Sequence, residues 1–305
     1  MTKKEHWLYK LIKRKIEKER LELDSWAAMR DKFFDVPESI QMIRDVPYVH
    51  EDDKYHTFDV FKHNNTDKNN PVIINIHGGG LLMGNKHQNK GFNIWLCQQG
   101  FLVYSVEYSL VPDVRVQNQL TEINQAFSII KERIFLDGGD VNKVALVGDS
   151  AGAFLALYST AIQNNKEIAE SFSVEPSNLD IKALVLQSGM FYTTKLDKVG
   201  FFLRKTLYGT DYKKQPFAKY LNPENDNLLN SVPPIYLMTS QNDNMKHYTL
   251  KFAKALDKEE KDYELVCYSN NKNRVHAFSA LYPEFKESIE ANIMIANFLC
   301  KRFEG

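Results

Sequence analysis

Residues 143–152 read Lys-Val-Ala-Leu-Val-Gly-Asp-Ser-Ala-Gly, an apolar segment that passes through a glycine-flanked serine into helix-forming residues. This order predicts a buried strand, a sharp turn and a helix. Gly148 to Gly152 fit the pattern Gly-x-Ser-x-Gly, in which Ser150 occupies a strained turn with its hydroxyl exposed. We expect both glycines to prevent collisions with the strand or helix, and to supply the positive φ of the turn. Alone, however, the pattern is found more often in ordinary strand-to-helix turns than at a nucleophile.

From residue 71 onward, short apolar segments alternate with helical patterns. The apolar segments, which predict strands, are 72–76, 102–106, 144–147, 183–186, 235–238 and 263–267. The helical patterns are 90–99, 116–133, 151–164, 245–256 and 284–301. Strands that are apolar throughout and separated by helices indicate a mostly parallel sheet with helices on both faces. Ligands of such sheets bind beyond the carboxyl ends of the strands, so functional residues should directly follow strands.

The first part of the chain shows different patterns. Apolar residues at helical spacing predict an amphipathic helix over residues 4–22, in which Lys and Arg fill most other positions. A helix packed on the domain is favoured over one that lies on a membrane surface. A second helix is expected over residues 24–34, before Pro37. Residues 47–63 alternate in the manner of paired strands, with a turn at 52–54.

Length, charge and cysteine content restrict the class of protein. The 305 residues contain no Pro/Gly/Ser-rich linker, which favours one domain, and 39 basic residues balance 39 acidic ones. That balance argues against a nucleic acid as partner. No apolar segment approaches a signal peptide or a membrane span, so we expect a cytoplasmic protein without stable membrane insertion. Cys97, Cys267 and Cys300 lack metal-ligand spacing. Whether the chain forms a homodimer is left open.

Three glycines follow the predicted strand at 72–76, in the run His77-Gly78-Gly79-Gly80. Such a run exposes backbone N–H groups with no side chains in the way, as a developing oxyanion requires. A flexible turn or a phosphate-binding loop would also contain glycines. The Gly-Lys-Ser/Thr of a Walker-type loop does not follow, which argues against phosphate binding.

The two motifs together resemble those of α/β-hydrolases, specifically the hormone-sensitive-lipase-like esterases, in which His-Gly-Gly-Gly precedes Gly-Asp-Ser-Ala-Gly. The resemblance covers about residues 45–303. It implies an oxyanion hole formed by Gly79, Gly80 and the N–H of Ala151, with His77 orienting the glycine loop. The run Tyr-Ser-Leu-Val-Pro-Asp at 108–113 departs from the family's usual Tyr-Arg-Leu-Ala-Pro-Glu, because the arginine is missing.

In this family the catalytic acid and histidine follow the serine in that order. Two histidines follow Ser150, and His247 lies within a predicted helix, whereas His276 follows the last predicted strand. Asp243 is the carboxylate in the loop after the strand at 235–238, although an aspartate there could instead cap the next helix. The expected roles are therefore nucleophile for Ser150, general base for His276 and orienting acid for Asp243.

The predicted function is that of a serine esterase, which cleaves small short-chain acyl or acetyl esters through an acyl-serine intermediate. No metal or organic cofactor is implied. We expect segments 1–45 and about 190–225 to form a helical cap, because Phe191, Tyr192, Phe201, Phe202 and Tyr208 crowd the second of them. Two alternatives remain: an amidase resembling the kynurenine formamidases, and a non-catalytic hydrolase-fold binding protein.

Overall fold

A parallel sheet with an antiparallel extension forms the centre of the computed structural model, which describes residues 3–49, 54–64, 69–195 and 204–304, with backbone alone for 3–12. In this part of the chain, eight strands are arranged in the order β1-β2-β4-β3-β5-β6-β7-β8. The first two strands, β1 (Ile40–Pro47) and β2 (Thr57–His63), run antiparallel at one edge. The others are parallel: β3 (Asn70–Ile76), β4 (Leu102–Val106), β5 (Gly139–Asp149), β6 (Ile181–Gln187), β7 (Ile235–Ser240) and β8 (Tyr263–Tyr268).

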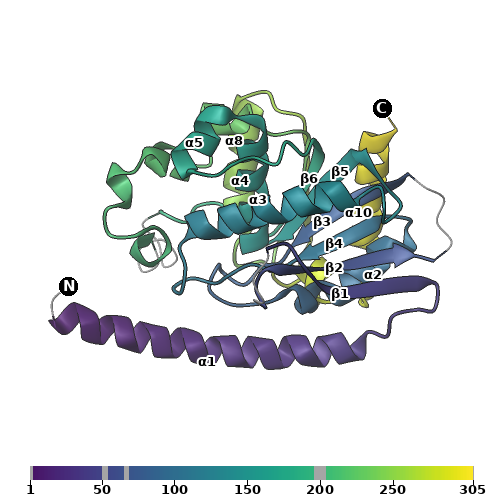
Figure 1. Ribbon diagram of the computed structural model, residues 1–305, viewed down its shortest axis with the longest axis horizontal. Coiled ribbons are helices and arrows are strands. Elements are labelled where there is room, and N and C mark those ends of the chain that lie inside the picture. The colour runs from purple at the N-terminus through teal and green to yellow at the C-terminus, as the bar shows by residue number, and fades with distance from the viewer. Residues whose placement is uncertain (1–2, 50–53, 65–68, 196–203, 305) are drawn as a thin grey trace.

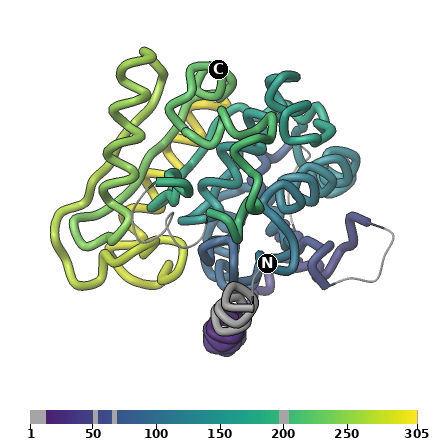
Figure 2. The backbone as a smooth tube through the Cα atoms, turned by 90° about the vertical axis from the view of Figure 1, so that its left-hand side faces the viewer, coloured from purple at the N-terminus to yellow at the C-terminus, as the bar shows by residue number. Residues whose placement is uncertain are grey.

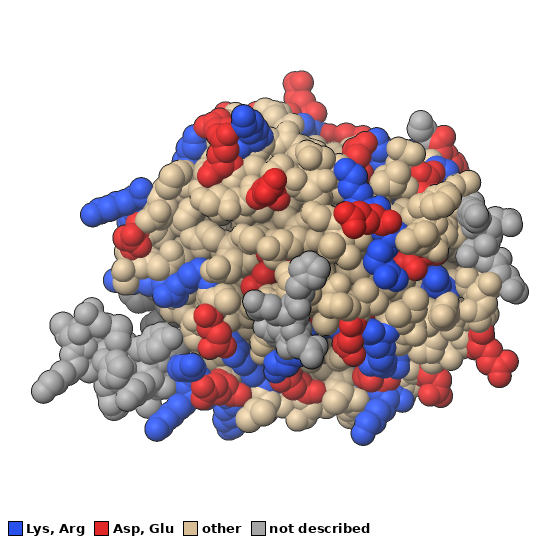
Figure 3. All heavy atoms as spheres, in the orientation of Figure 1, with Lys and Arg blue, Asp and Glu red and all other residues tan. Residues whose placement is uncertain are grey.

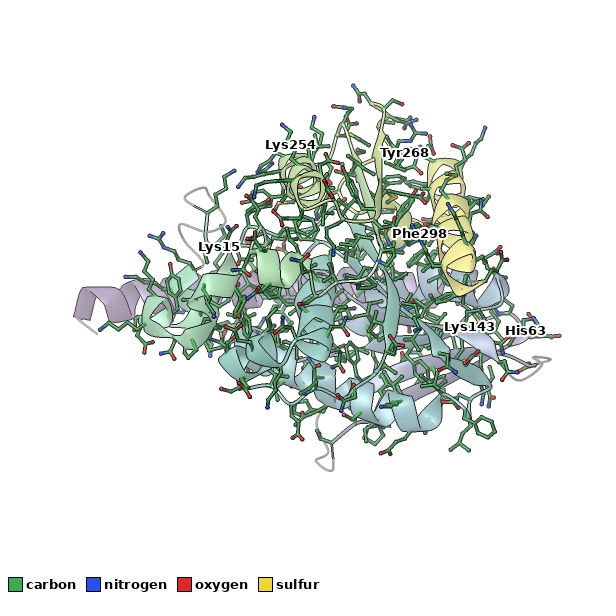
Figure 4. All side chains as sticks on the ribbon, turned by 90° about the horizontal axis from the view of Figure 1, so that it is seen from above. Lys15, His63, Lys143, Lys254, Tyr268 and Phe298 are labelled. Atoms are coloured by element: carbon green, nitrogen blue, oxygen red, sulfur yellow. The ribbon has the colours of Figure 1, made fainter. Side chains whose placement is uncertain are left out.

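Helices cover both faces of the sheet (Figure 1). One layer contains α3 (Val116–Arg133), α4 (Ala151–Asn164) and α8 (Lys246–Lys258), and the other contains α2 (Lys90–Gln98) and α10 (Lys286–Phe303). Figure 4 shows Lys254 of α8 and Phe298 of α10 on either side of β8. Ile74 of β3 packs into the first layer and Ile73 into the second, because successive side chains point to opposite faces. The strands are apolar throughout for this reason.

Shorter helices connect these elements. They are η1 (Lys86–Asn89), α5 (Lys166–Phe172), η2 (Tyr212–Lys214), η3 (Pro216–Leu221), α7 (Asp226–Leu229) and α9 (Phe278–Leu281). The six predicted strands and five predicted helices from residue 71 onward are confirmed, with boundaries that differ by a few residues. The predicted α/β fold, with a mostly parallel sheet covered on both faces, is confirmed as well.

Two expectations for the N-terminal part were wrong. A single helix, α1 (Lys3–Phe33), replaces the two predicted ones, because neither glycine nor proline interrupts residues 3–33. The first antiparallel strand is β1, which ends where the predicted pair at 47–63 begins. This edge strand is half-exposed and contains polar residues such as Arg44, so it lacks a clear apolar alternation. Residues 40–45, which were expected at the end of the cap segment 1–45, therefore belong to strand β1. Most of the predicted turn at 52–54 lies outside the described residues.

The long helix α1 lies outside both layers, beneath the body in Figure 1 and seen end-on in Figure 2. Figure 4 shows its Lys15 on the side opposite to Lys143 and His63, which mark the amino edge of the parallel strands. Arg20 of α1 donates to the carbonyl oxygens of Leu82 (2.6 Å) and Val111 (2.8 Å), in the loops after β3 and β4. The helix therefore crosses the carboxyl side of the sheet.

The C-terminal half of α1 is held by Arg30, which is 6% exposed. Its guanidinium donates two hydrogen bonds to the Glu284 carboxylate (2.8 and 2.7 Å) and one to the Leu281 carbonyl oxygen (3.0 Å). It also lies over the rings of Trp26 and Tyr282, at 5.8 and 5.4 Å from their centroids. One side chain thus joins α1 to the segment between α9 and α10.

We expect Arg30→Met to lower the free energy of unfolding by about 2 to 4 kcal/mol, because it leaves the partly buried Glu284 without its partner. Urea denaturation followed by circular dichroism would measure the change. The matched control is Arg14→Met, which changes an exposed residue of the same helix. Equal stability of the two variants would contradict the prediction.

Charged side chains of both signs are interspersed on the face of the molecule seen in Figure 3. Neither sign forms a continuous patch there. Among the residues that the structure describes, no helix is long and apolar enough to span a bilayer.

Candidate active site

The serine of the Gly-x-Ser-x-Gly motif occupies the turn between β5 and α4. Ser150 has φ 53° and ψ −112°, a conformation that non-glycine residues rarely adopt. Backbone hydrogen bonds hold it there, from Ser150 N to Gln187 O (2.8 Å) and from Met190 N to Ser150 O (3.0 Å). The positive φ thus lies at the serine, whereas it was expected at the flanking glycines. Gly152 is required for close packing, since a Cβ there would lie 1.9 Å from the Ile76 carbonyl oxygen.

His276 and Asp243 form a hydrogen-bonded pair. The imidazole Nδ1 of His276 lies 2.7 Å from Asp243 Oδ1. The carboxylate accepts two further hydrogen bonds, from Met245 N (2.8 Å) and from the Thr239 hydroxyl (2.7 Å). Burial alone would raise the pKa of Asp243, but the hydrogen bonds from His276, Thr239 and Met245 lower it below its usual value. The group therefore stays ionised beside the imidazole.

The glycine loop follows β3. Gly79 has φ 121° and Gly80 has φ 64°, both in the region that favours glycine. At Gly79 a Cβ would lie 1.9 Å from the Met83 carbonyl oxygen, so no other residue fits. The Gly79 carbonyl oxygen accepts hydrogen bonds from Leu82 N and Met83 N (3.1 and 3.0 Å). The loop is consequently a defined turn.

Asp149 connects the glycine loop to the serine turn. Its Oδ1 accepts hydrogen bonds from Gly78 N (3.1 Å) and from the Asn89 side-chain amide (2.8 Å). The side chain is buried, and burial raises its pKa even though these hydrogen bonds act in the opposite direction. Asp149 therefore has the geometry of a structural support for both loops.

One cavity of about 430 Å³ contains most of the residues singled out in the sequence. Ser150, His276, Gly79 and Gly80 line it. Asp243 reaches the cavity through its hydrogen bond to His276. Ala151 follows Ser150 as the first residue of α4. The competing histidine, His247, lies in α8 beside the ring of Tyr248.

Four apolar residues of the cavity wall were not identified from the sequence: Leu23, Trp26, Leu281 and Tyr282. The rings of Trp26 and Tyr282 meet edge to face, with centroids 6.0 Å apart. The helical stripe that includes the buried Ile16 and Ala27 would have indicated which side of α1 packs inward. No local pattern relates Trp26 to Tyr282, however, because they lie far apart in the chain.

The described aromatic residues of segment 190–225, which was expected to form part of a cap, lie away from the cavity. Phe191 stacks on Phe252 of α8, with centroids 4.5 Å apart, and Tyr208 hydrogen bonds to Thr193 (2.6 Å). As far as the chain is described, none of these aromatic side chains lines the cavity. Phe201 and Phe202 lie outside the described residues.

A family model described as alpha/beta hydrolase fold matches residues 73–280, which contain the glycine loop, the serine turn and both candidate partners. The chain belongs to this family. Among curated relatives, the isoprenylcysteine alpha-carbonyl methylesterase ICME of Arabidopsis thaliana is 27% identical over 239 residues, which is 72% of this chain and 54% of the relative. The acetyl esterase of Salmonella schwarzengrund is 31% identical over 98 residues, 32% of this chain and 30% of the relative. This α/β-hydrolase spans about half the length of the curated methylesterase relatives that it matches.

Solved structures of esterases share the fold of this α/β-hydrolase. Esterase B of Lactobacillus rhamnosis superposes with a TM-score of 0.89 at 23% identity, covering 97% of this chain and 96% of the esterase. The esterase of Pyrobaculum calidifontis superposes with a TM-score of 0.69 at 20% identity, covering 93% and 92%. At these identities, both below 25%, the likeness shows a shared fold and nothing further.

Proposed function

We propose that this α/β-hydrolase cleaves small carboxylic esters, with Ser150 as nucleophile. The observation that carries the proposal is that Ser150, His276 and the loop of Gly79 and Gly80 border one cavity, while Asp243 binds His276 Nδ1. A nucleophile, a base oriented by an acid, and exposed backbone N–H groups are the parts that acyl transfer requires. The relatives and the solved structures named above are ester hydrolases, which favours an ester over an amide as substrate.

The proposed reaction starts with the proton on His276 Nδ1, held by the ionised Asp243, so that Nε2 is free to act as base. Nε2 takes the Ser150 hydroxyl proton as the oxygen attacks the acyl carbonyl. The N–H groups of Gly79, Gly80 and Ala151 stabilise the negative oxygen that forms. His276 then gives its proton to the leaving alcohol. Water, deprotonated by His276, attacks the acyl-serine, and His276 gives this proton to Ser150 Oγ as the acid leaves.

The test compares chromogenic esters with N-formyl and aryl amides of matched acyl size. We expect turnover of the esters and little or none of the amides. Preference for the amides would favour an amidase of the kynurenine-formamidase type. Failure to react with any substrate and with a fluorophosphonate probe would favour a non-catalytic binding protein.

We propose short acyl groups as the preferred substrates. A cavity of about 430 Å³ lies near the lower end of the usual range for small-molecule sites, and Leu23, Trp26, Leu281 and Tyr282 make part of its wall apolar. A solved structure of Esterase B is described as inhibited by a C4-C4 tributyrin phosphonate. That protein has a closely similar fold, with a TM-score of 0.89. We therefore expect a preference near four carbon atoms in this chain.

Trp26→Ala should shift the chain-length preference toward longer acyl groups, because it removes an indole from the cavity wall. Each methylene that gains an apolar contact is worth about 1 to 3 kcal/mol, so kcat/KM for hexanoate and octanoate esters should rise relative to acetate. The measurement is kcat/KM for p-nitrophenyl esters of increasing length. Leu21→Ala, on the exposed side of the same helix, is the control. An identical profile in Trp26→Ala and wild type would show that α1 does not limit the pocket.

A further inference from the structure

His77 lies at the start of the glycine loop, and the reaction proposed above does not use its side chain. The residue is 1% exposed, and its ring stacks on Tyr108 with centroids 4.3 Å apart. Imidazole Nε2 lies 3.0 Å from Glu107 Oε1, and Nδ1 lies 2.7 Å from the Gly78 carbonyl oxygen. Both ring nitrogens therefore have an oxygen within hydrogen-bonding distance.

These partners determine where the protons must be. A carbonyl oxygen has no proton to give, so Nδ1 of His77 has to donate to Gly78. On the other side, Glu107 Oε1 faces Nε2 while Glu107 Oε2 accepts from Lys86 N (3.0 Å). Both Glu107 oxygens thus face donors, and an ionised carboxylate is the form of glutamate that only accepts. The Tyr108 hydroxyl does not supply a proton to Nδ1, because it donates to the His77 carbonyl oxygen (2.7 Å).

We infer that His77, beyond the loop-orienting role expected from the sequence, is a buried imidazolium held by Glu107 whose charge strengthens the oxyanion hole. This inference rests on the proposed function. Glu107 binds the loop at both ends, at His77 and at the backbone of Lys86. The Gly78 carbonyl that accepts from His77 Nδ1 (2.7 Å) belongs to the same peptide group as the Gly79 N–H, and hydrogen bonds in such a chain polarise one another. A charged His77 would thus make the Gly79 N–H a stronger donor to a negative oxygen.

The charged and titratable groups around His77 agree with this state. They are Glu107 and Tyr108, which follow β4, and Asp149 at the end of β5. Burial disfavours the imidazolium, but Glu107, the Gly78 carbonyl and Asp149 together raise the pKa of His77 above its usual value. The nearby Lys86 ammonium is occupied by Asp45 and Asp59 (2.5 and 3.0 Å). Because the pKa is raised, the cation persists to higher pH than in a free imidazole, and it is lost as pH rises through the folded-state pKa.

Glu107→Gln separates charge from hydrogen bonding. The glutamine oxygen can accept from Lys86 N, and its NH₂ can donate to Nε2 of a neutral His77 that keeps its proton on Nδ1. The hydrogen bonds to His77 and Lys86 keep their partners, the long one from Tyr108 N (3.4 Å) is lost, and the ion pair is gone. We expect a folded variant whose kcat for a p-nitrophenyl ester falls about 10- to 100-fold, somewhat less than the loss of a whole oxyanion donor. KM should stay nearly unchanged.

Two further readouts distinguish this role from a merely structural one. In wild type, kcat should fall at alkaline pH as His77 loses its proton, and this fall should be absent in Glu107→Gln. Nitrogen-15 NMR of labelled histidine should show both ring nitrogens of His77 protonated in wild type and one in the variant. The signal is assigned by its loss in His77→Gln.

The control is Glu122→Gln, which changes another buried carboxylate, one that accepts from Ser109 N (2.7 Å) and not from the glycine loop. It should keep the wild-type kcat and pH profile. Wild-type kcat in Glu107→Gln, or a neutral His77 in wild-type protein, would overturn the inference. If wild type cleaves no ester, the proposed function fails, and the NMR measurement on its own still decides the charge of His77.

Discussion

Replacing Ser150 with alanine should lower kcat for a short-chain ester by about four to six orders of magnitude, as loss of a nucleophile does when triad members act together. The serine turn has the geometry for this role. Ser150 is the N-cap residue of α4, with φ 53°, and borders the same cavity as His276. It precedes Ala151, whose N–H lies at the helix N-terminus. Among the described residues that line the cavity, Ser150 is the one serine or threonine.

The measurement is single-turnover and steady-state hydrolysis of p-nitrophenyl butyrate, together with labelling by a fluorophosphonate. Both should be lost in Ser150→Ala while circular dichroism and the melting temperature stay close to wild type. Ser159→Ala, a buried serine on the same helix α4, serves as the control and should remain fully active. Near-native turnover by Ser150→Ala would end the proposal that Ser150 is the nucleophile.

The second large effect is expected from His276→Ala, with a loss in kcat of about four to six orders of magnitude for the same reason. His276 is the histidine that combines a place at the cavity with a carboxylate partner, since its Nδ1 lies 2.7 Å from Asp243 Oδ1. Without the imidazole, the Ser150 proton has no acceptor during attack. The acyl-serine would also lack a base to activate water.

His247→Ala is the matched control, because His247 is the other histidine that follows Ser150 in the chain. It lies on α8 beside Tyr248, so its loss should leave kcat unchanged. Steady-state kinetics of both variants on one ester would decide between them. Loss of activity in His247→Ala with retention in His276→Ala would show that the general base was assigned to the wrong residue.

The sequence by itself determined the architecture and pointed to the residues around the cavity. The strand-turn-helix at 143–152 and the alternation of strands and helices after residue 71 are local patterns, and local periodicity reports which face of an element is buried. In a parallel sheet the carboxyl ends of the strands meet at one edge. Residues placed directly after strands, such as Gly79, Ser150 and His276, were therefore expected near one another, and they border one cavity.

The tertiary structure alone decided what surrounds these residues. Trp26 and Tyr282 form a wall of the cavity, Arg30 binds Glu284, and Glu107 joins His77 to Lys86. The edge strand β1 could likewise not be predicted from the sequence, because it lacks an apolar alternation. Its pairing with β2 makes it a strand. The physical reason is common to all of them: a hydrogen bond or ring contact between distant residues depends on how whole elements pack. Spacing along the chain reveals which side of a helix or strand is apolar, but not which partner that side will meet.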